Sequence, residues 1–283
     1  MHSVDGLGLP CSFEDAAVLA DFDALMTGYL ASSADVMDRL DDVLTREELP
    51  IALCFRGYLL KMASNPRLSG AIDDCLARLQ GCDLTAREQA HVAALTAWHA
   101  QQADVALSRI ETILDEYPRD ILALRIAHHL HFYNGEPSAM RQSVEKCLPA
   151  WSEKDPLYGF VVGMYSFALE ESAEYREAEI KARQACDLNP GDIWAGHAMA
   201  HCCQMQGRWI DGLEWMEVMM PNWQDKNNFV NHLHWHQALF HLGRYEYNAA
   251  LAIYDEKLER PLNDDFYLDA CNAASLLWRL DME

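Results

Sequence analysis

The chain has 283 residues, of which 51% are hydrophobic, so it can bury a sizeable core and extensive disorder is excluded. Its formal net charge is −22. Nucleic acids and anionic membranes both require a basic surface, so this charge argues against either as the main partner. The longest acidic cluster, Asp35 to Glu48, is too short to form a tail. We therefore interpret the acidic excess as a solvated surface.

The nine cysteines are an odd number, and no two of them form a C-x-x-C pair. Most lie on predicted apolar helix faces, so we interpret them as reduced core residues in a reducing compartment rather than as redox or metal-binding thiols. No apolar run approaches the ~18 residues of a membrane span. Met1 to Asp15 lacks the basic and apolar segments of a signal peptide. These features predict a cytoplasmic protein.

The N-terminal part of the chain, residues 1–84, is predicted to form two degenerate helical hairpins. The glycine-rich stretch from His2 to Ser12 is expected to be irregular. Ser12 or Asp15 can cap the first helix and Ser33 the second, because their side-chain oxygens accept hydrogen bonds from free backbone N–H groups at a helix start. Pro50 can open the third helix, since proline is well tolerated in a first turn. The predicted helices span residues 16–30, 35–44, 51–63 and 68–79.

A repeat pattern is clearest from Tyr175 to Pro190. An aromatic residue, three alanines at helical spacing and a closing proline are typical of the second helix of a tetratricopeptide (TPR) repeat. Ala178, Ala182 and Ala185 share one helix face and let a neighbouring helix approach closely. The same pattern predicts repeat starts at Arg87, Ile121, Gly159, Ile193 and Phe229. These starts are 34, 38, 34 and 36 residues apart, close to the TPR period of ~34.

Each repeat is predicted to carry a strip of small or apolar residues on its second helix. Thr85 and Glu88 form a capping box that opens the first repeat. Ala173 stands where the turn between the two helices of a TPR repeat usually has glycine. The strips are Ala106, Ile110 and Ile113; Met140, Val144 and Cys147; the three alanines already named; Gly212, Met216 and Met219; and Asn248 and Ala252.

The sequence therefore predicts an all-α fold: a TPR-like α-solenoid of antiparallel helix pairs wound into a right-handed superhelix. We expect one domain over residues 1–283. It would comprise the degenerate hairpins (1–84), five TPR-like repeats (85–262) and a final helix (263–283).

The first helices of successive TPR repeats line a concave groove, where ligands usually bind. The predicted groove is rich in histidine, glutamate and aromatic residues, and Arg125 is its one basic residue. The predicted ligand-binding residues are Glu88, His91, Arg125, His129, Tyr133, Glu170, Glu171, Trp194, His197, His201 and Gln237.

Two histidine pairs have i, i+4 spacing: His197 with His201, and His232 with His236. Both rings of such a pair leave the same helix face and can grip one metal ion if a third ligand arrives from elsewhere. Glu170, His129 or His91 could supply that ligand. No Glu follows the first histidine, so a zinc-protease motif is excluded. Packing within the helical array and ligand contact stay open as alternatives, and no cofactor beyond such a divalent metal is predicted.

Acid–base chemistry is a further alternative for the groove. A histidine would act as general base, a glutamate as acid, and Arg125 would hold an anion. The candidate catalytic residues are His91, Glu170, His197 and His201.

Several segments together resemble the tetratricopeptide repeat protein 38 family. They are T-A-R-E-Q-A-H-V-A-A-L (85–95), P-R-D-I-L-A-L (118–124), F-A-L-E-E (167–171), W-A-G-H-A-M-A-H (194–201), H-L-H-W-H-Q-A-L (232–239) and S-L-L-W-R-L (275–280). The resemblance covers nearly the whole chain from about Asp5. Family members continue past the last segment, so the chain resembles a member without its C-terminal part. The resemblance implies the TPR-like fold and leaves the activity open.

We expect a binding module first: a scaffold that holds a protein, a peptide segment or a small polar ligand in the groove. An enzyme using the same groove is the second hypothesis. An assembly scaffold that forms a homodimer through its C-terminal helix is the third.

Overall fold

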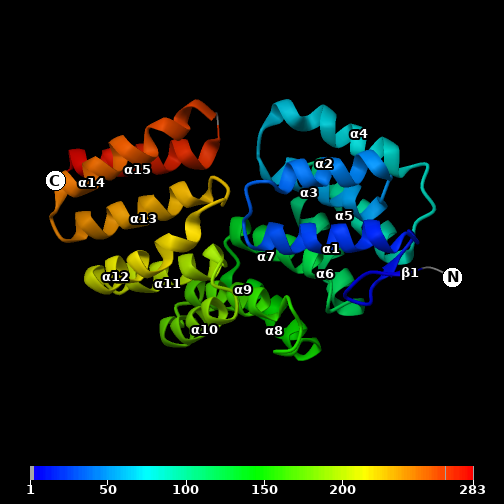
Figure 1. The fold of residues 1–283 in the computed structure, drawn as a ribbon, viewed down its shortest axis with the longest axis horizontal. Helices are drawn as coiled ribbons and strands as arrows, with labels where there is room; N and C mark the ends of the chain where they lie inside the picture. Colours follow the sequence, from blue (N-terminus) through cyan, green and yellow to red (C-terminus); the bar gives the residue numbers. More distant parts are fainter. Residues whose placement is uncertain (1–2, 265, 283) are drawn as a thin grey trace. The chain divides into compact units, whose positions relative to one another are not determined.

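The computed structural model describes residues 3–264 and 266–282 of the chain (Figure 1). Over these residues the protein is all-α apart from one short hairpin, which confirms the predicted fold class. The α-helices are α1 (Ala16–Leu30), α2 (Val36–Arg46), α3 (Pro50–Met62), α4 (Ser69–Leu79), α5 (Ala86–His99), α6 (Ala103–Glu116), α7 (Ile121–Asn134), α8 (Pro137–Cys147), α9 (Tyr158–Glu171), α10 (Tyr175–Leu188), α11 (Ile193–Met205), α12 (Trp209–Met219), α13 (Phe229–Gly243), α14 (Tyr247–Ile253) and α15 (Tyr267–Asp281).

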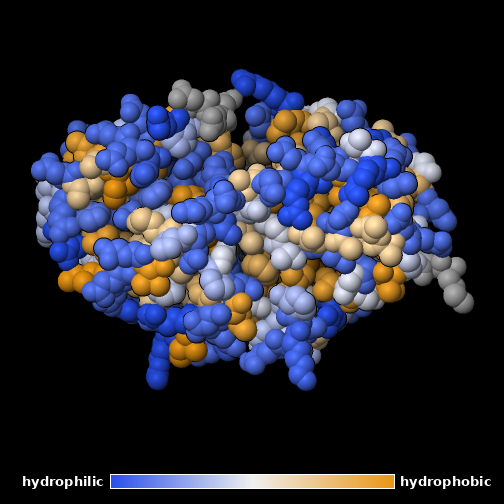
Figure 2. Space-filling model, viewed as in Figure 1, coloured by the Kyte–Doolittle hydropathy of each residue, from blue (hydrophilic) through white to orange (hydrophobic). Residues whose placement is uncertain are grey.

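The helices group into two compact units. Unit 1 comprises Met1–Tyr29 and Asp35–Val161, and unit 2 comprises Leu30–Ala34 and Val162–Glu283. The expectation of a single domain stays a prediction. Figure 2 shows hydrophilic residues over most of the visible surface, as the net charge of −22 requires. Among the described residues, no helix is both long enough and apolar enough to cross a membrane.

The N-terminal stretch forms a small β-hairpin, which corrects the expectation of an irregular segment. β1 (Ser3–Val4) pairs antiparallel with β2 (Pro10–Cys11). The Asp5 carboxylate closes the turn by accepting hydrogen bonds from the backbone N–H groups of Leu7 and Leu9, at 3.0 and 2.9 Å. Gly8 adopts the left-handed conformation, with φ of 77°, which glycine reaches without strain.

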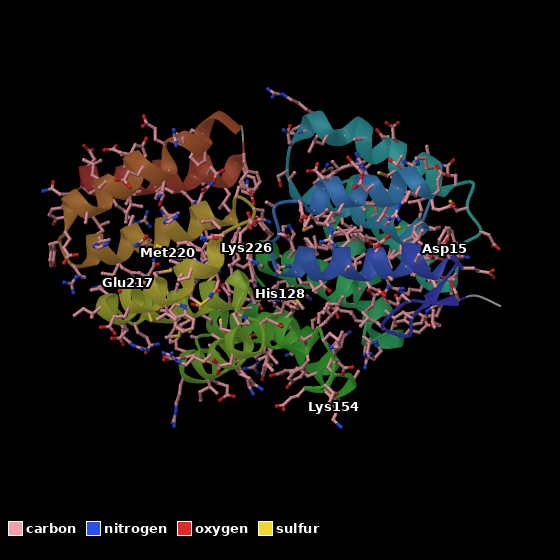
Figure 3. All side chains as sticks on the ribbon, in the orientation of Figure 1. Asp15, His128, Lys154, Glu217, Met220 and Lys226 are labelled. Atoms are coloured by element: carbon pink, nitrogen blue, oxygen red, sulfur yellow. The ribbon has the colours of Figure 1, made fainter. Side chains whose placement is uncertain are left out.

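The first four helices lie close to their predicted ranges. Asp15, labelled in Figure 3, caps α1 by accepting from the backbone N–H of Ala17 at 2.8 Å. Pro50 is the first residue of α3, as predicted. The expected cap of α2 by Ser33 is wrong: Ser33 instead forms a short β-bridge with Lys226 in unit 2. The Lys226 ammonium donates to the Ala31 carbonyl at 2.8 Å and helps to hold this segment.

The five repeats begin within one residue of their predicted starts. Their first helices, α5, α7, α9, α11 and α13, each lead to a turn with one residue of positive φ before the second helix. These left-handed residues are Gln101, Gly135, Ala173, Gly207 and Tyr245. They are 34, 38, 34 and 38 residues apart, so the turns repeat at the TPR period.

The predicted strips on the second helices of the first four repeats are buried. Ala178, Ala182 and Ala185 have no exposed surface, as close helix packing requires. The strip of the fifth repeat is wrong, because Asn248 and Ala252 are exposed and Ala250 is buried instead. α13 extends through Gly243, so α14 begins later than the register places it.

His131 joins α7 to neighbouring elements through two carboxylates. Its Nδ1 lies 2.9 Å from Glu136 Oε2 and its Nε2 lies 2.9 Å from Glu111 Oε1. Burial lowers the pKa of His131, but the hydrogen bonds to Glu111 and Glu136 outweigh burial and raise the pKa above its ordinary value of 6.5. A carboxylate beside each ring nitrogen favours the protonated form, which can donate from both nitrogens.

We expect His131→Gln to lower the free energy of unfolding by about 1–2 kcal/mol at pH 6. A raised pKa gives stability that is complete below the ordinary value of 6.5 and is lost as the pH rises through the folded-state value. The difference between wild type and variant should thus shrink at alkaline pH, as urea unfolding at several pH values would measure. His99→Gln is the control, since His99 faces one mostly exposed carboxylate, Asp73. A difference independent of pH would contradict this account.

Candidate functional site

A buried charge network occupies the start of the first two repeats in unit 1. Arg87 donates through Nε to Asp120 at 2.6 Å and through Nη1 to Asp5 at 3.0 Å. His91 Nε2 lies 3.0 Å from the same Asp120 oxygen, and its Nδ1 lies 3.2 Å from the Tyr58 hydroxyl. Burial opposes ionisation of Asp120, but Arg87 and His91 hold its pKa well below its ordinary value. The network joins the N-terminal hairpin to α5 and α7.

Two predicted groove residues belong to this buried region instead. His91 has no exposed surface, because Tyr58 and Asp120 cover both of its ring nitrogens. Glu88 is also fully buried, since its carboxylate accepts from Thr85 and from Ser12. The capping box of Thr85 and Glu88 is confirmed. Neither His91 nor Glu88 can contact a ligand in an open groove.

Unit 1 contains a cavity of about 520 Å³ at the ends of α3, α5 and α7. The predicted groove residues His129 and Tyr133 line it. Tyr133 is 55% exposed, and the His129 and Tyr133 rings lie 4.5 Å apart between centroids. Burial, with a smaller contribution from Arg125, lowers the pKa of His129 to about 3, so this ring is neutral. The lining residues are Leu60, Lys61, Ser64, Asn65, Pro66, Ser69, Ile72, Trp98, His99, Gln101, Ala103, His129, Leu130, Tyr133 and Asn134.

Arg125 is not among the residues that line this cavity. It lies within hydrogen-bonding reach of the hydroxyl of the half-buried Tyr29 on α1 and lowers the pKa values of its neighbours His128 and His129. Tyr29 therefore competes with any bound anion for the Arg125 guanidinium, which we predicted to hold an anion in the groove.

In unit 2 the two predicted histidine pairs meet. The Asp192 carboxylate caps α11 by accepting from the backbone N–H of Ala195 at 3.0 Å, and α11 then places His197 and His201 on one face. α13 places His232 and His236 opposite them. His232 Nε2 lies 3.0 Å from His197 Nε2 and 3.2 Å from His236 Nε2. One ligand atom from each of the four rings lies within 4.8 Å of all the others.

Polar side chains orient three of the four rings. His232 Nδ1 lies 2.9 Å from Asn272 Oδ1, and His236 Nδ1 lies 2.7 Å from Gln204 Oε1. His201 Nδ1 lies 3.2 Å from the buried Glu170. Burial lowers the pKa of His232 to about 4 and that of His236 well below its ordinary value, so both rings are neutral.

The predicted acidic residues lie beside His201. Glu171 Oε1 is 3.9 Å from His201 Nδ1, and burial together with the charge of Glu170 raises the pKa of Glu171. Glu170, Glu171 and His201 form a second group whose ligand atoms all lie within 4.8 Å of one another. His91 and His129 were also predicted as possible third metal ligands for a histidine pair. Both belong to unit 1 and have the partners described above.

Aromatic rings surround the histidine cluster of unit 2. The ring centroids of Trp194 and His197 lie 5.4 Å apart, and Phe167 stacks on His197 with centroids 5.5 Å apart. Phe229 and Trp235 lie 5.5 and 5.2 Å from His232. Trp194 therefore packs against the cluster and is half-buried rather than an open platform.

The last predicted groove residue, Gln237, lines a separate cavity of about 420 Å³ in unit 2. Its amide oxygen lies 3.2 Å from His234 Nδ1. Sequence reasoning missed this cavity and missed Asn272. Asn272 comes from α15, and no local spacing connects it with a histidine forty residues away.

No protein-family model matches the chain. The solved structures that are similar to it in fold include the following three. A TPR protein from Parabacteroides merdae shares 16% identity over 92% of this chain and 97% of its own, with a TM-score of 0.55. A thermophilic TPR protein from Thermus thermophilus shares 17% sequence identity over 68% of this chain and 100% of its own, with a TM-score of 0.52. A Rap protein in complex with Competence and Sporulation Factor shares 9% sequence identity over 89% of this chain and 79% of its own, with a TM-score of 0.60.

These similarities, together with the repeat geometry, show that the chain has a TPR-like α-solenoid fold. At such low identities they establish the fold alone. The resemblance to the tetratricopeptide repeat protein 38 family stays a prediction.

Proposed function

We propose that this TPR-like scaffold binds a peptide segment of a protein partner in the cavity of unit 1. The observation that carries the proposal is an open cavity of about 520 Å³ at the ends of α3, α5 and α7, with an exposed tyrosine on its wall. The Rap structure similar in fold holds Competence and Sporulation Factor, so a similar helical array accommodates a bound partner.

The cavity wall carries the groups that peptide recognition needs. Trp98, His129 and Tyr133 offer ring faces and edges to an apolar or aromatic side chain. Asn65 and Asn134 offer side-chain amides, which can both donate to and accept from a peptide backbone.

Lys61 gives the cavity a preference for an anionic group. Burial alone lowers the pKa of Lys61, and a carboxylate on the ligand would offset that cost by pairing with the ammonium. We therefore propose an acidic peptide that also carries an apolar anchor. A small polar ligand with a carboxylate is the alternative occupant.

We expect Tyr133→Ala to weaken peptide binding about tenfold or more, because exposed aromatic anchors carry much of the binding energy of such sites. Peptides selected from a random phage-displayed library would be measured by fluorescence anisotropy against wild type and variant. Lys61→Met should weaken the binding of acidic peptides and leave the binding of their neutral counterparts unchanged.

Tyr245→Ala is the matched control, since Tyr245 is 74% exposed in unit 2 and does not line the cavity. The proposal fails if selected peptides bind Tyr133→Ala as tightly as wild type. Selection of no peptide, combined with saturable binding of small dicarboxylates that requires Lys61, would instead support the small polar ligand.

The acid–base alternative is not proposed. Its candidate base His91 is fully buried, and its anion holder Arg125 lies beside Tyr29. The predicted homodimer also stays a prediction. α15 does present exposed apolar side chains, with Leu277 at 40% and Trp278 at 68% exposure.

A further inference from the structure

In the histidine cluster of unit 2, His232 Nε2 lies against the Nε2 atoms of both His197 and His236. Asn272 Oδ1 and Gln204 Oε1 are carbonyl oxygens and can only accept, so the Nδ1 atoms of His232 and His236 carry the ring protons. A neutral imidazole with its proton on Nδ1 has a lone pair on Nε2. The two Nε2 atoms face each other at 3.2 Å, with their Nδ1 atoms turned towards Asn272 and Gln204.

His197 adds a third nitrogen to this point. Its Nε2 lies 3.0 Å from His232 Nε2, and a ring nitrogen of His201 completes a set within 4.8 Å. A cation between these nitrogens would be coordinated by their lone pairs. Two nitrogens bound to one tetrahedral Zn²⁺ at ~2.0–2.1 Å are about 3.3–3.4 Å apart, close to the spacings of 3.0 and 3.2 Å found here.

The surroundings of the cluster are those of a metal site as well. Metal-binding histidines commonly use their second nitrogen to contact a carbonyl or carboxylate, which fixes the orientation of the ring. Asn272 and Gln204 occupy these positions for His232 and His236, and Glu170 Oε2 lies 3.2 Å from His201 Nδ1. His197 and His236 are 3% and 2% exposed, and Phe167 and Trp235 stack on the rings of His197 and His232.

We propose that His197, His201, His232 and His236 bind one divalent transition-metal ion, and that Zn²⁺ is its preferred occupant. Imidazole nitrogens suit Zn²⁺, and four protein ligands leave no open position, which is the arrangement of a structural site. The ion links α11 to α13 and so fastens two successive repeats. Through Asn272 it also fixes the position of α15 against His232. The proposal is independent of peptide binding in unit 1.

The test uses the full chain without a histidine tag. The protein is stripped with a chelator, dialysed against Zn²⁺ and freed of excess metal, and its zinc content is measured by mass spectrometry. We expect one zinc per chain and a higher melting temperature with zinc than without it. Substitution with Co²⁺ should give the strong visible absorption of a tetrahedral cobalt site.

His232→Gln and His236→Gln should each abolish stoichiometric zinc and the cobalt absorption. His234→Gln is the matched control, because His234 lies on the same helix but contacts Trp223 and Gln237 instead of the cluster. Asn272→Ala should keep the site and weaken its zinc affinity about 10–100-fold.

Circular dichroism separates loss of metal from loss of fold in the histidine variants, and Asn272→Ala supplies a graded readout if either variant unfolds. The proposal is overturned if the stripped wild type takes up no zinc. It is also overturned if zinc binding survives in the folded double variant of His232 and His236, or falls equally in His234→Gln.

Discussion

Asp120→Ala is expected to lower the free energy of unfolding by about 3–5 kcal/mol, the usual cost of removing one partner of a buried ion pair. Asp120 is fully buried, and its Oδ2 contacts both Arg87 and His91. Its Oδ1 also caps α7 by accepting from the Ala123 backbone N–H at 3.0 Å. The variant therefore leaves a buried guanidinium with Asp5 as its remaining carboxylate. Urea unfolding at pH 7 would measure the loss.

The effect of Asp120→Ala should depend on pH in one direction. A carboxyl group with a lowered pKa contributes stability above its ordinary value, here 3.8, and loses it as the pH falls towards the folded-state value. The difference between wild type and variant should thus be largest near neutrality and shrink in acid. Arg46→Ala is the control, because its partner Asp21 and Arg46 itself are half-exposed and such pairs contribute about 0–1 kcal/mol. Equal losses in the two variants would refute the assignment of a buried network.

Phe240→Ala should destabilise unit 2 by about 3–5 kcal/mol, since its ring is fully buried and the truncation leaves a cavity. The ring packs on Gly212 so closely that a Cβ atom at Gly212 would lie 2.6–2.7 Å from three ring carbons. Gly212→Ala should therefore also destabilise the wild type, by about 1–3 kcal/mol, because a rigid ring must move.

The two substitutions should compensate each other. In the Phe240→Ala background the added methyl group of Gly212→Ala enters the space of the missing ring, so its cost should fall to near zero. Thermal unfolding of the single and double variants gives the coupling energy. Simple additivity would show that α12 and α13 do not meet at this point.

The fold could be predicted closely because its determinants are local. Thr85 and Asp15 mark helix starts through side-chain caps and Pro50 through its ring, and the alanines of α10 mark a packed face by their spacing alone. Only the second helix of the fifth repeat was misplaced. Its strip was predicted at Asn248 and Ala252, but α13 continues through Gly243, where Trp209 packs against it, and Ala250 is buried instead.

The candidate sites could be predicted only in part, since they depend on contacts between distant helices. The spacing i, i+4 places His232 and His236 on one face, but their encounter with His197 follows from the packing of α11 on α13. The prediction that His91 lines the groove was wrong because Tyr58, which precedes the repeats, covers its ring. Gln204 and Asn272 have no local signal that connects them with a histidine ring.

The left-handed turn residues have a practical consequence. Three of the five, Gln101, Ala173 and Tyr245, carry side chains that are exposed to solvent. Cysteines placed there would carry fluorescent labels at the turns between the two helices of the first, third and fifth repeats, with little disturbance of packing. Repeat proteins unfold through neighbour-to-neighbour interactions. Such labels would follow the order in which the repeats separate under denaturant, and so would show where the chain begins to open.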